Sequence, residues 1–261
     1  MFDEKAFENR LTTSWLGQDF IYVEQLDSTN SYLRRAESDK VGHGTICLTD
    51  HQTHGRGRYE RKWVTRPSAN LTFTIAFKPS RVAGLHVLTL ASALAITETV
   101  DQCLDVECDI KWPNDIYYKN KKLGGILTES VFTGNQIDRV LVGIGLNVNQ
   151  EKFSEPIDQT ATSMYQIAGG KSFKREPILA GVLQRIEHFY SQWQRFDVKL
   201  LKAINRRIIG YGEWVSLQVG GERYDGKCKF LGINEEGALV VLTSNDEIKT
   251  FSYEQVHITT D

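Results

Sequence analysis

The chain has 261 residues, enough to bury a sizeable core and to form one large domain and a small one. Its formal net charge is only −2, which argues against a general affinity for nucleic acid or anionic membranes, so phosphate chemistry would need a local basic cluster. Residues 1–10 lack the pattern of a signal peptide, residues 85–100 are too short and polar to span a bilayer, and the four scattered cysteines indicate reduced thiols. The composition therefore favours a cytoplasmic globular protein.

The first half of the chain predicts strands and helices in alternation. Short apolar runs bounded by turn residues predict strands, and a Ser/Thr/Asn cluster before an apolar periodic run predicts a helix cap. The expected elements are strands at 19–25, 44–49 and 71–77, a helix that starts at the cap Asp27-Ser28-Thr29-Asn30, and a buried helix at 85–100. The polar stretch 51–62, rich in glycine and arginine, is expected to be a loop because it cannot form a core element.

The second half predicts more strands, then a pair of helices, then a small barrel. The expected elements are strands at 109–118, 122–132 and 137–148, helices at 177–196 and 199–208, and short strands at 214–219, 223–233, 238–243 and 248–251. Short strands at this spacing, after the composition change at Gly210 and Gly212, are typical of a small barrel. We therefore expect two domains, residues 1–209 and 210–261.

The densest local signal is the segment Gly55-Arg56-Gly57-Arg58-Tyr59-Glu60-Arg61-Lys62-Trp63. Its glycines let the backbone approach a ligand closely, its arginines suit phosphate, and Trp63 offers a flat face on which a nucleobase could stack. The alternative interpretation of the same residues is a solvated basic loop, or a nucleic-acid patch.

A second signal is Lys111-Trp112-Pro113-Asn114-Asp115, followed by Lys121-Lys122-Leu123-Gly124-Gly125. Proline inside a strand-like run argues for a break there, and Asn114 and Asp115 then offer oxygen ligands at that break. Asp115 could hold Mg²⁺ or act as a base. The alternative is a simple Pro-Asn-Asp turn, which these residue types also favour.

The third signal is Gly143-Ile144-Gly145-Leu146-Asn147 within an apolar run. Glycine weakens the interior of a strand unless something must approach the backbone, so this segment is either a ligand contact or a bulge beside the core. Neither this segment nor Gly170-Lys171-Ser172 completes a dinucleotide or P-loop glycine motif, so a nucleotide site would have to use other elements.

Taken together, these segments resemble the bacterial biotin–protein ligase family in order and spacing over most of the chain. The residues that carry the resemblance are Asp27-Ser28-Thr29-Asn30, Gln52 and the segments 55–63, 111–115, 122–125 and 143–147. The resemblance implies an α+β fold: a mixed β-sheet flanked by helices, as in class II aminoacyl-tRNA synthetases and lipoate ligases, with a small C-terminal SH3-like β-barrel. It also implies an enzyme that uses ATP and Mg²⁺ to activate biotin as biotinyl-5′-AMP and attaches it to a lysine of a biotin carboxyl carrier protein.

The resemblance implies a role for each matched residue. Biotin contacts are implied for Ser28, Thr29, Gln52, Gly55, Arg56, Arg58, Lys122, Gly125 and Gly143. Nucleotide contacts are implied for Arg58, Arg61, Trp63, Lys111, Asn114 and Asn147. Catalytic roles are implied for Arg58, Lys122 and Asp115, with Asp115 also as the metal ligand. The segment 55–63 is expected to close over biotin and its adenylate.

The regulatory members of that family carry a helix-turn-helix before the catalytic domain. Here the strand-and-cap pattern begins within about two dozen residues of Met1, too few for such a three-helix module. We therefore expect the short form of the enzyme, with no DNA or membrane partner; its oligomeric state is open, with a homodimer as one alternative.

Two other functions compete with this one. A lipoate or octanoate ligase could use the same scaffold, but the Gly-Arg-Gly-Arg segment is not part of its pattern. A nucleic-acid-binding module could use the arginine-rich segment and the barrel, although the near-neutral net charge disfavours it.

Overall fold

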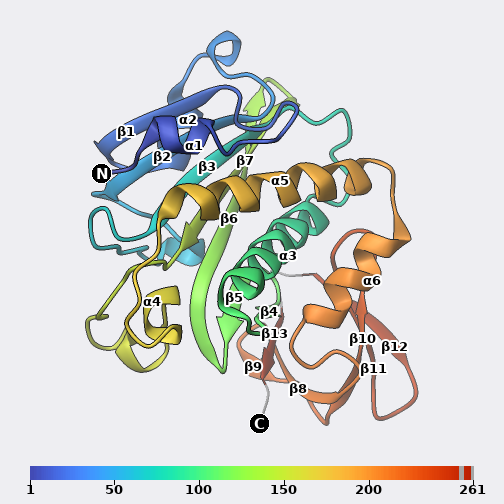
Figure 1. Ribbon diagram of the computed structural model, residues 1–261. Coiled ribbons are helices and arrows are strands. Elements are labelled where there is room, and N and C mark those ends of the chain that lie inside the picture. The colour runs from blue at the N-terminus through green and yellow to red at the C-terminus, as the bar shows by residue number, and fades with distance from the viewer. Residues whose placement is uncertain (253–255, 260–261) are drawn as a thin grey trace.

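A seven-stranded mixed sheet lies at the centre of the molecule, in the order β1-β2-β3-β7-β6-β5-β4 (Figure 1). This computed structural model describes residues 1–252 and 256–259. The strands are β1 (Phe20–Leu26), β2 (Thr45–Gln52), β3 (Leu71–Phe77), β4 (Asp109–Lys111), β5 (Asp115–Tyr118), β6 (Lys121–Thr133) and β7 (Gln136–Leu146). β1 and β2 pair in parallel, and the other neighbouring pairs are antiparallel. Because of the parallel pairing, the ends of β1 and β2 meet: Leu26 and Gln52 are register partners.

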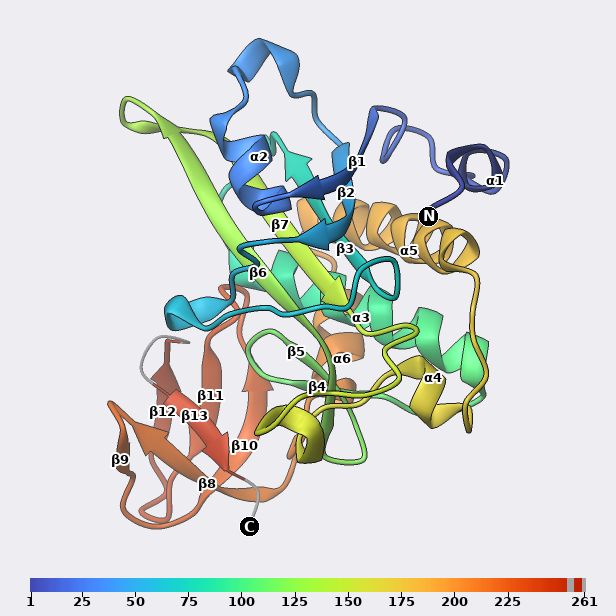
Figure 2. The same cartoon turned by 90° about the vertical axis from the view of Figure 1, so that its left-hand side faces the viewer.

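Helices cover both faces of this sheet (Figure 2). They are α1 (Glu4–Glu8), α2 (Thr29–Arg35), α3 (Leu85–Leu104), α4 (Met164–Ile167), α5 (Arg175–Gln194) and α6 (Val198–Arg207), with 3-10 turns η1 (Ser38–Lys40), η2 (Arg58–Glu60) and η3 (Ile157–Gln159). Neighbouring residues of β2 belong to different apolar clusters: Ile46 packs in the large one with α3 and α5, whereas Cys47 packs in a small one with Leu33 of α2. Successive strand residues point to opposite faces, so α2 covers the face opposite to α3 and α5.

α3 is the central helix of the core. Within the described ranges it is the one helix long and apolar enough to cross a membrane by length and composition, yet 72% of its most apolar window is buried inside the protein. The hydroxyls of Ser92 and Thr99 donate to backbone carbonyls one turn earlier, which satisfies these buried polar groups. These contacts fit a core helix.

A second, antiparallel sheet forms a half-barrel near the C-terminus (Figure 1). Its strands are β8 (Trp214–Val219), β9 (Glu222–Arg223), β10 (Cys228–Ile233), β11 (Leu239–Leu242), β12 (Ile248–Phe251) and β13 (Val256–Thr259). They follow the order β12-β11-β10-β8-β13, with β9 beside β8. The half-barrel contacts the segment before β5, because Trp112 Nε1 donates to the carbonyl of Gly237 at 3.2 Å.

The expected fold class is confirmed: a mixed sheet flanked by helices, with a small C-terminal β-barrel element. The strands expected at 71–77 and 214–219 coincide with β3 and β8. The run 109–118 is two strands and not one, because residues 112–114 form a turn at the break that Pro113 predicts. The sequence did not predict α1, α4 or β13, which have only 5, 4 and 4 residues.

Candidate active site

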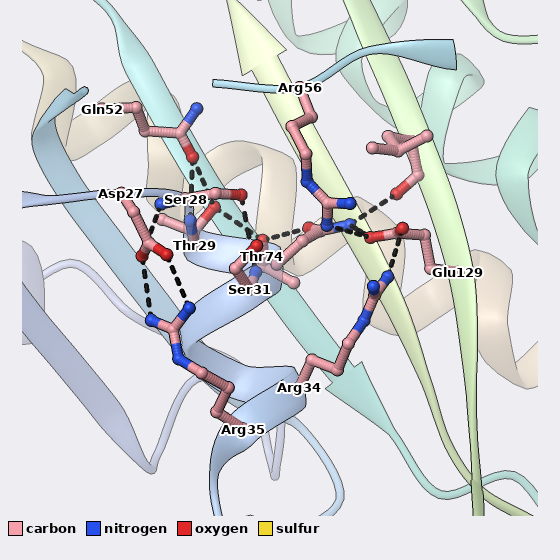
Figure 3. Close-up of polar contacts among 12 residues, drawn as sticks. Asp27, Ser28, Thr29, Ser31, Arg34, Arg35, Gln52, Arg56, Thr74 and Glu129 are labelled. Carbon is pink, nitrogen blue, oxygen red and sulfur yellow. Dashed lines mark hydrogen bonds and ion pairs between the residues drawn. The ribbon is translucent and has the colours of Figure 1, made fainter. Parts of the chain in front are cut away.

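The N-terminus of α2 meets the end of β2 on the face of the sheet that α2 covers (Figure 3). Ser28 caps the helix by accepting a hydrogen bond from the backbone of Ser31, as the sequence predicts. The backbone N–H of Thr29 donates to Gln52 Oε1 at 2.8 Å, and its hydroxyl lies 3.2 Å from the same oxygen. The parallel register of β1 and β2 is what brings this turn to Gln52, so three of the predicted biotin contacts form one polar cluster.

An exposed ion pair supports this turn from outside. Asp27 accepts hydrogen bonds from Arg35 of α2 and from the backbone of Ser28. The hydrogen bond from Arg35 holds the pKa of Asp27 at about 2, so the carboxylate is charged at any ordinary pH.

Two glycines of β7 lie under side chains from other segments. A Cβ at Gly143 would lie 2.2 Å from Asn30 Oδ1, and a Cβ at Gly145 would lie 2.3 Å from the Trp63 ring. The pairing of β7 with β3 and β6 is regular at both positions, so the bulge interpretation of this segment is wrong. The glycines are needed because Asn30 and Trp63 approach the strand more closely than a side chain would allow.

Residues 55–63, called the arginine loop from here on, fold back on themselves. Gly57 N–H donates to the carbonyl of Arg61 at 2.7 Å, and Trp63 N–H donates to the carbonyl of Gly55 at 3.0 Å. Tyr59, at the far end, has a positive φ of 52° and a 60% exposed side chain. The loop is therefore anchored at its base, beside the sheet, and exposed at its tip.

The arginines of this loop contact two other parts of the site. Arg56 forms an ion pair with Glu129 of β6, with 3.1 Å between Nη2 and Oε2. Arg58 donates to Asn114 Oδ1 at 3.3 Å and to the hydroxyl of Tyr59 at 3.0 Å. The contact with Asn114 shows that the segments 55–63 and 111–115, both singled out from the sequence, lie next to each other in the structure.

Lys122 and Asp115 form an ion pair beside the loop. Their Nζ and Oδ1 atoms lie 2.7 Å apart, and the side chains are 34% and 23% exposed. A Cβ at Gly125 would lie 3.0 Å from Asp115 Oδ1 and 3.1 Å from Lys122 Nζ, so glycine leaves room for the pair. Lys122 Nζ also lies 5.9 Å from the Trp63 ring, which places a cation next to the aromatic face.

The Asp115 carboxylate could serve as one protein ligand of a metal ion that arrives with a nucleotide. No group of three or more His, Cys, Asp or Glu side chains suited to a metal occurs among the described residues. Mg²⁺, however, is commonly held by one or two carboxylates together with substrate phosphates and water. Asp115 can supply one such carboxylate, and its existing pair with Lys122 argues against a resident ion held by the protein alone.

The remaining predicted nucleotide residues lie around this centre. Asn147 is 5% exposed and its side chain donates to the carbonyl of Thr162 at 3.0 Å. Lys111 Nζ lies 5.0 Å from the Tyr117 ring. Burial and the Asp115 carboxylate raise the pKa of Tyr117, whereas the positive charge of Arg61 lowers it. Trp63 Nε1 is a buried donor for which the described residues offer no acceptor.

Three polar residues of this region were not among the predicted site residues. Thr74 Oγ1 of β3 lies 2.7 Å from Thr29 Oγ1 and 2.5 Å from Asn30 Oδ1. Asn30 Nδ2 in turn donates to Glu129 Oε2 at 2.7 Å. Asn30 stands in the cap motif, whereas Thr74 and Glu129 stand in strand patterns that carry no local sign of a site.

The fold, the basic glycine loop and the strand lysine define the class of carboxylate-activating ligases that modify proteins. A model of the Biotin/lipoate A/B protein ligase family matches residues 22–147. The bifunctional ligase/repressor BirA of Bacillus subtilis is 30% identical over 246 residues, which are 93% of this chain and 75% of that relative. The biotin–[acetyl-CoA-carboxylase] ligase of Mycobacterium tuberculosis is 29% identical over 98% of this chain and 96% of its own length.

Solved structures agree with these relatives. A biotin protein ligase from Aquifex aeolicus, in complex with biotin and ATP, is similar with a TM-score of 0.80 and 31% identity, over 93% of this chain and 100% of that one. A biotin protein ligase from Leishmania major, in complex with biotinyl-5-AMP, is similar with a TM-score of 0.62 and 25% identity, over 90% of this chain and 99% of that one. The chain belongs to the biotin–protein ligase family and is a biotin ligase enzyme.

Proposed function

We propose that this enzyme forms biotinyl-5′-AMP from biotin and ATP, and then transfers the biotinyl group to one lysine of a biotin carboxyl carrier protein. The observation that carries the proposal is the convergence of three features on one side of β6 and β7. They are the polar turn at Ser28 and Thr29, the Lys122–Asp115 pair, and the arginine loop.

The polar turn supports biotin as the acid that is activated. A ureido ring has two N–H donors and one carbonyl acceptor, and the hydroxyls and amide of Ser28, Thr29 and Gln52 can match both kinds of group. Ser28 and Thr29 are buried, and a ligand without hydrogen-bonding groups would make no use of the donors and acceptors that remain on these hydroxyls and on the Gln52 amide. The dithiolane ring of lipoate has no N–H or O–H group, which makes it the poorer fit.

In the first step an oxygen of the biotin carboxylate attacks the α-phosphorus of ATP. The new P–O bond forms as the bond from the α-phosphorus to the pyrophosphate oxygen breaks, and pyrophosphate leaves. Lys122 and Arg58 can offset the negative charge where the two anions meet. Mg²⁺ carried by ATP would neutralise further phosphate charge, with Asp115 as its protein ligand.

In the second step the acceptor lysine amine attacks the biotinyl carbonyl carbon. An amide bond forms, the bond to the AMP oxygen breaks, and the amine loses a proton, for which Asp115 is the candidate acceptor. The mixed anhydride is prone to hydrolysis, so ordering of the arginine loop over it would exclude water until the acceptor arrives. The aromatic face of Trp63 and its buried N–H, for which the described residues offer no acceptor, support an adenine contact at the base of that loop.

The test is mass spectrometry of the protein after incubation with biotin and MgATP, followed by addition of a biotin carboxyl carrier domain. We expect retained biotinyl-AMP in the first stage, and a carrier domain that is biotinylated on one lysine in the second. Pyrophosphate release that depends on lipoate and not on biotin would contradict the proposal. Adenylate formation without transfer to the carrier domain would contradict the proposed acceptor alone.

The organisation and location of the chain are also inferred. We infer that residues 1–209 form the biotin- and ATP-binding unit and that residues 210–261 form the barrel unit, since the second sheet begins at Trp214. A reducing, cytoplasmic location is supported by Cys47, Cys103, Cys108 and Cys228, all of which have free thiols.

A further inference from the structure

Glu129 of β6 lies where the polar turn and the arginine loop meet (Figure 3). Its side chain is only 18% exposed. Oε2 accepts from Asn30 Nδ2 at 2.7 Å and from Arg56 Nη2 at 3.1 Å, and Oε1 forms an ion pair with Arg34 of α2. One carboxylate therefore binds the helix that carries the turn, the turn itself and the loop.

A role in stability alone does not account for this arrangement. Arg34 and Arg56 are each 40% exposed, and ion pairs at such positions contribute little to the free energy of folding. Glu129 connects two residues that are far from it in sequence. Asn30 lies 99 residues away and Arg56 lies 73 residues away.

The connection continues from Glu129 to the predicted biotin contacts. Asn30 Oδ1 lies 2.5 Å from Thr74 Oγ1, which lies 2.7 Å from Thr29 Oγ1. Thr29 N–H in turn donates to Gln52 Oε1. A continuous polar network thus runs from Gln52 to Glu129, and Arg56 attaches the base of the arginine loop to its end.

The base of the loop is a useful place for such an attachment. Arg56 follows Gly55, whose carbonyl accepts from the backbone of Trp63, and it bridges to Lys62 across the loop. Fixing Arg56 therefore limits the movement of both chain segments at the base of the loop, while the tip at Tyr59 remains exposed.

We propose that Glu129 is a positioning residue that couples the biotin-binding turn to the arginine loop. It holds the turn through Asn30 and the loop through Arg56, so that biotin in the turn and closure of the loop over the adenylate favour each other. Coupling between two sites of one protein is typically about 5–150-fold. The inference rests on the proposed function, because it needs an adenylate for the loop to retain.

Glu129→Gln keeps an oxygen that accepts hydrogen bonds but removes the charge that pairs with Arg56 and Arg34. The amide oxygen can still accept from Asn30, but it carries no charge to pair with Arg56. We expect biotin affinity to remain near that of the wild type, while release of biotinyl-AMP rises about 5-fold or more, the lower end of such coupling. Release is measured as biotin on serum albumin, at matched rates of adenylate synthesis. Glu129→Ala, which also removes one of the two acceptors of Asn30 and leaves only the carbonyl of Leu127, should weaken biotin binding as well.

The matched control is Arg185→Gln. Arg185 of α5 forms an ion pair with Glu98 of α3, on the face of the sheet away from the turn, so this variant also removes one arginine–carboxylate pair but leaves the turn and the loop unchanged. We expect wild-type retention of the adenylate. A second test combines Glu129→Gln with Arg56→Gln: if the two residues act as one unit, the double variant releases no more adenylate than either single variant.

The outcomes separate the inference from the proposed function. If Arg58→Gly releases adenylate and Glu129→Gln does not, the coupling role is wrong although the loop retains the intermediate. A lower melting temperature of Glu129→Gln without greater release, or independent effects in the double variant, would also overturn it. If wild-type protein forms no biotinyl-AMP, the proposed function fails and this inference fails with it.

Discussion

The two sides of the active site are constructed differently. The side predicted to bind biotin is held by strand register and by buried side chains such as Thr29, which is 2% exposed. The arginine loop holds its place through long arginine side chains and backbone contacts at its base, and Tyr59 at its tip is 60% exposed.

This difference fits two separate tasks. Recognition of a small polar head needs donors and acceptors at fixed positions, which a sheet provides. Retention of a reactive intermediate needs a segment that can open and close, and glycine permits that rearrangement. We therefore expect changes on the sheet side to reduce adenylate formation or biotin binding, and changes in the loop to reduce retention.

Lys122→Ala should have the largest effect. Lys122 stands on the sheet side, and its loss leaves Asp115 without its ion-pair partner and removes one of the cations that offset the developing charge at the α-phosphate. We expect adenylate formation, measured by pyrophosphate release, to fall by about 10²–10³-fold. Lys121→Ala is the control, because the neighbouring Lys121 is exposed and should retain wild-type activity. Near-normal turnover of Lys122→Ala would place the charge stabiliser elsewhere.

Gly143→Ala should weaken biotin binding next most strongly. The new Cβ would lie 2.2 Å from Asn30 Oδ1, so Asn30 must move and the turn moves with it. Overpacking of this kind costs roughly 1–3 kcal/mol, so we expect the Kd for biotin to rise by about 5-fold to 150-fold. Gly42→Ala is the control, because its nearest contact is an ordinary 3.5 Å. Equal affinities of both variants would show that the turn tolerates the displacement.

Arg58→Gly tests the other side of the comparison. The substitution removes the contact with Asn114 and adds backbone freedom, so ordering of the loop costs more entropy. Lys122 remains, so part of adenylate synthesis should survive, while labelling of serum albumin should rise several-fold at matched synthesis. Labelling equal to that of the wild type would mean that the arginine loop does not retain the intermediate.

Glu187→Gln should leave activity unchanged and alter only stability. Glu187 of α5 accepts from the backbone N–H groups of Ser14, Trp15 and Leu16 at 2.8–3.0 Å. Burial raises its pKa, but these hydrogen bonds outweigh it and lower the pKa below the usual 4.5. A lowered pKa stabilises the fold above pH 4.5, and the contribution is lost as the pH falls through the folded-state value.

The measurement is the melting temperature of both forms between pH 7 and pH 3. We expect Glu187→Gln to melt lower at pH 7, and the gap to close as the medium becomes more acidic. A gap that does not depend on pH would assign the contribution to packing and not to the charge.

The sequence predicts elements well where local pattern and tertiary structure agree. β3 is an apolar run between polar segments, and Ser28 is a cap residue before an apolar periodic helix, so both are predicted correctly. α1 depends instead on contacts that no local pattern reveals, since Phe7 is buried against Phe2 and Phe20. A helix of 5 residues has little stability of its own.

The same limit applies to the site. The residues matched by motif converge because β1 pairs with β2 in parallel and β6 pairs with β7 antiparallel. The order of the motifs along the sequence does not specify this pairing. Glu129 could not be predicted because a glutamate in a half-polar strand is typical of a solvent-facing position. Its partners Asn30 and Arg56 lie 99 and 73 residues away.

The contact between Trp112 and Gly237 has a consequence for local unfolding. Trp112 is 3% exposed, and it precedes Asn114 and Asp115 in the segment that reaches the arginine loop and Lys122. Opening of the half-barrel would remove its hydrogen-bond acceptor and loosen that segment. Ligands that bind only the intact site should therefore slow amide hydrogen exchange in β10 and β11. Binding at the catalytic centre would then raise the free energy of opening of a sheet that lies outside it.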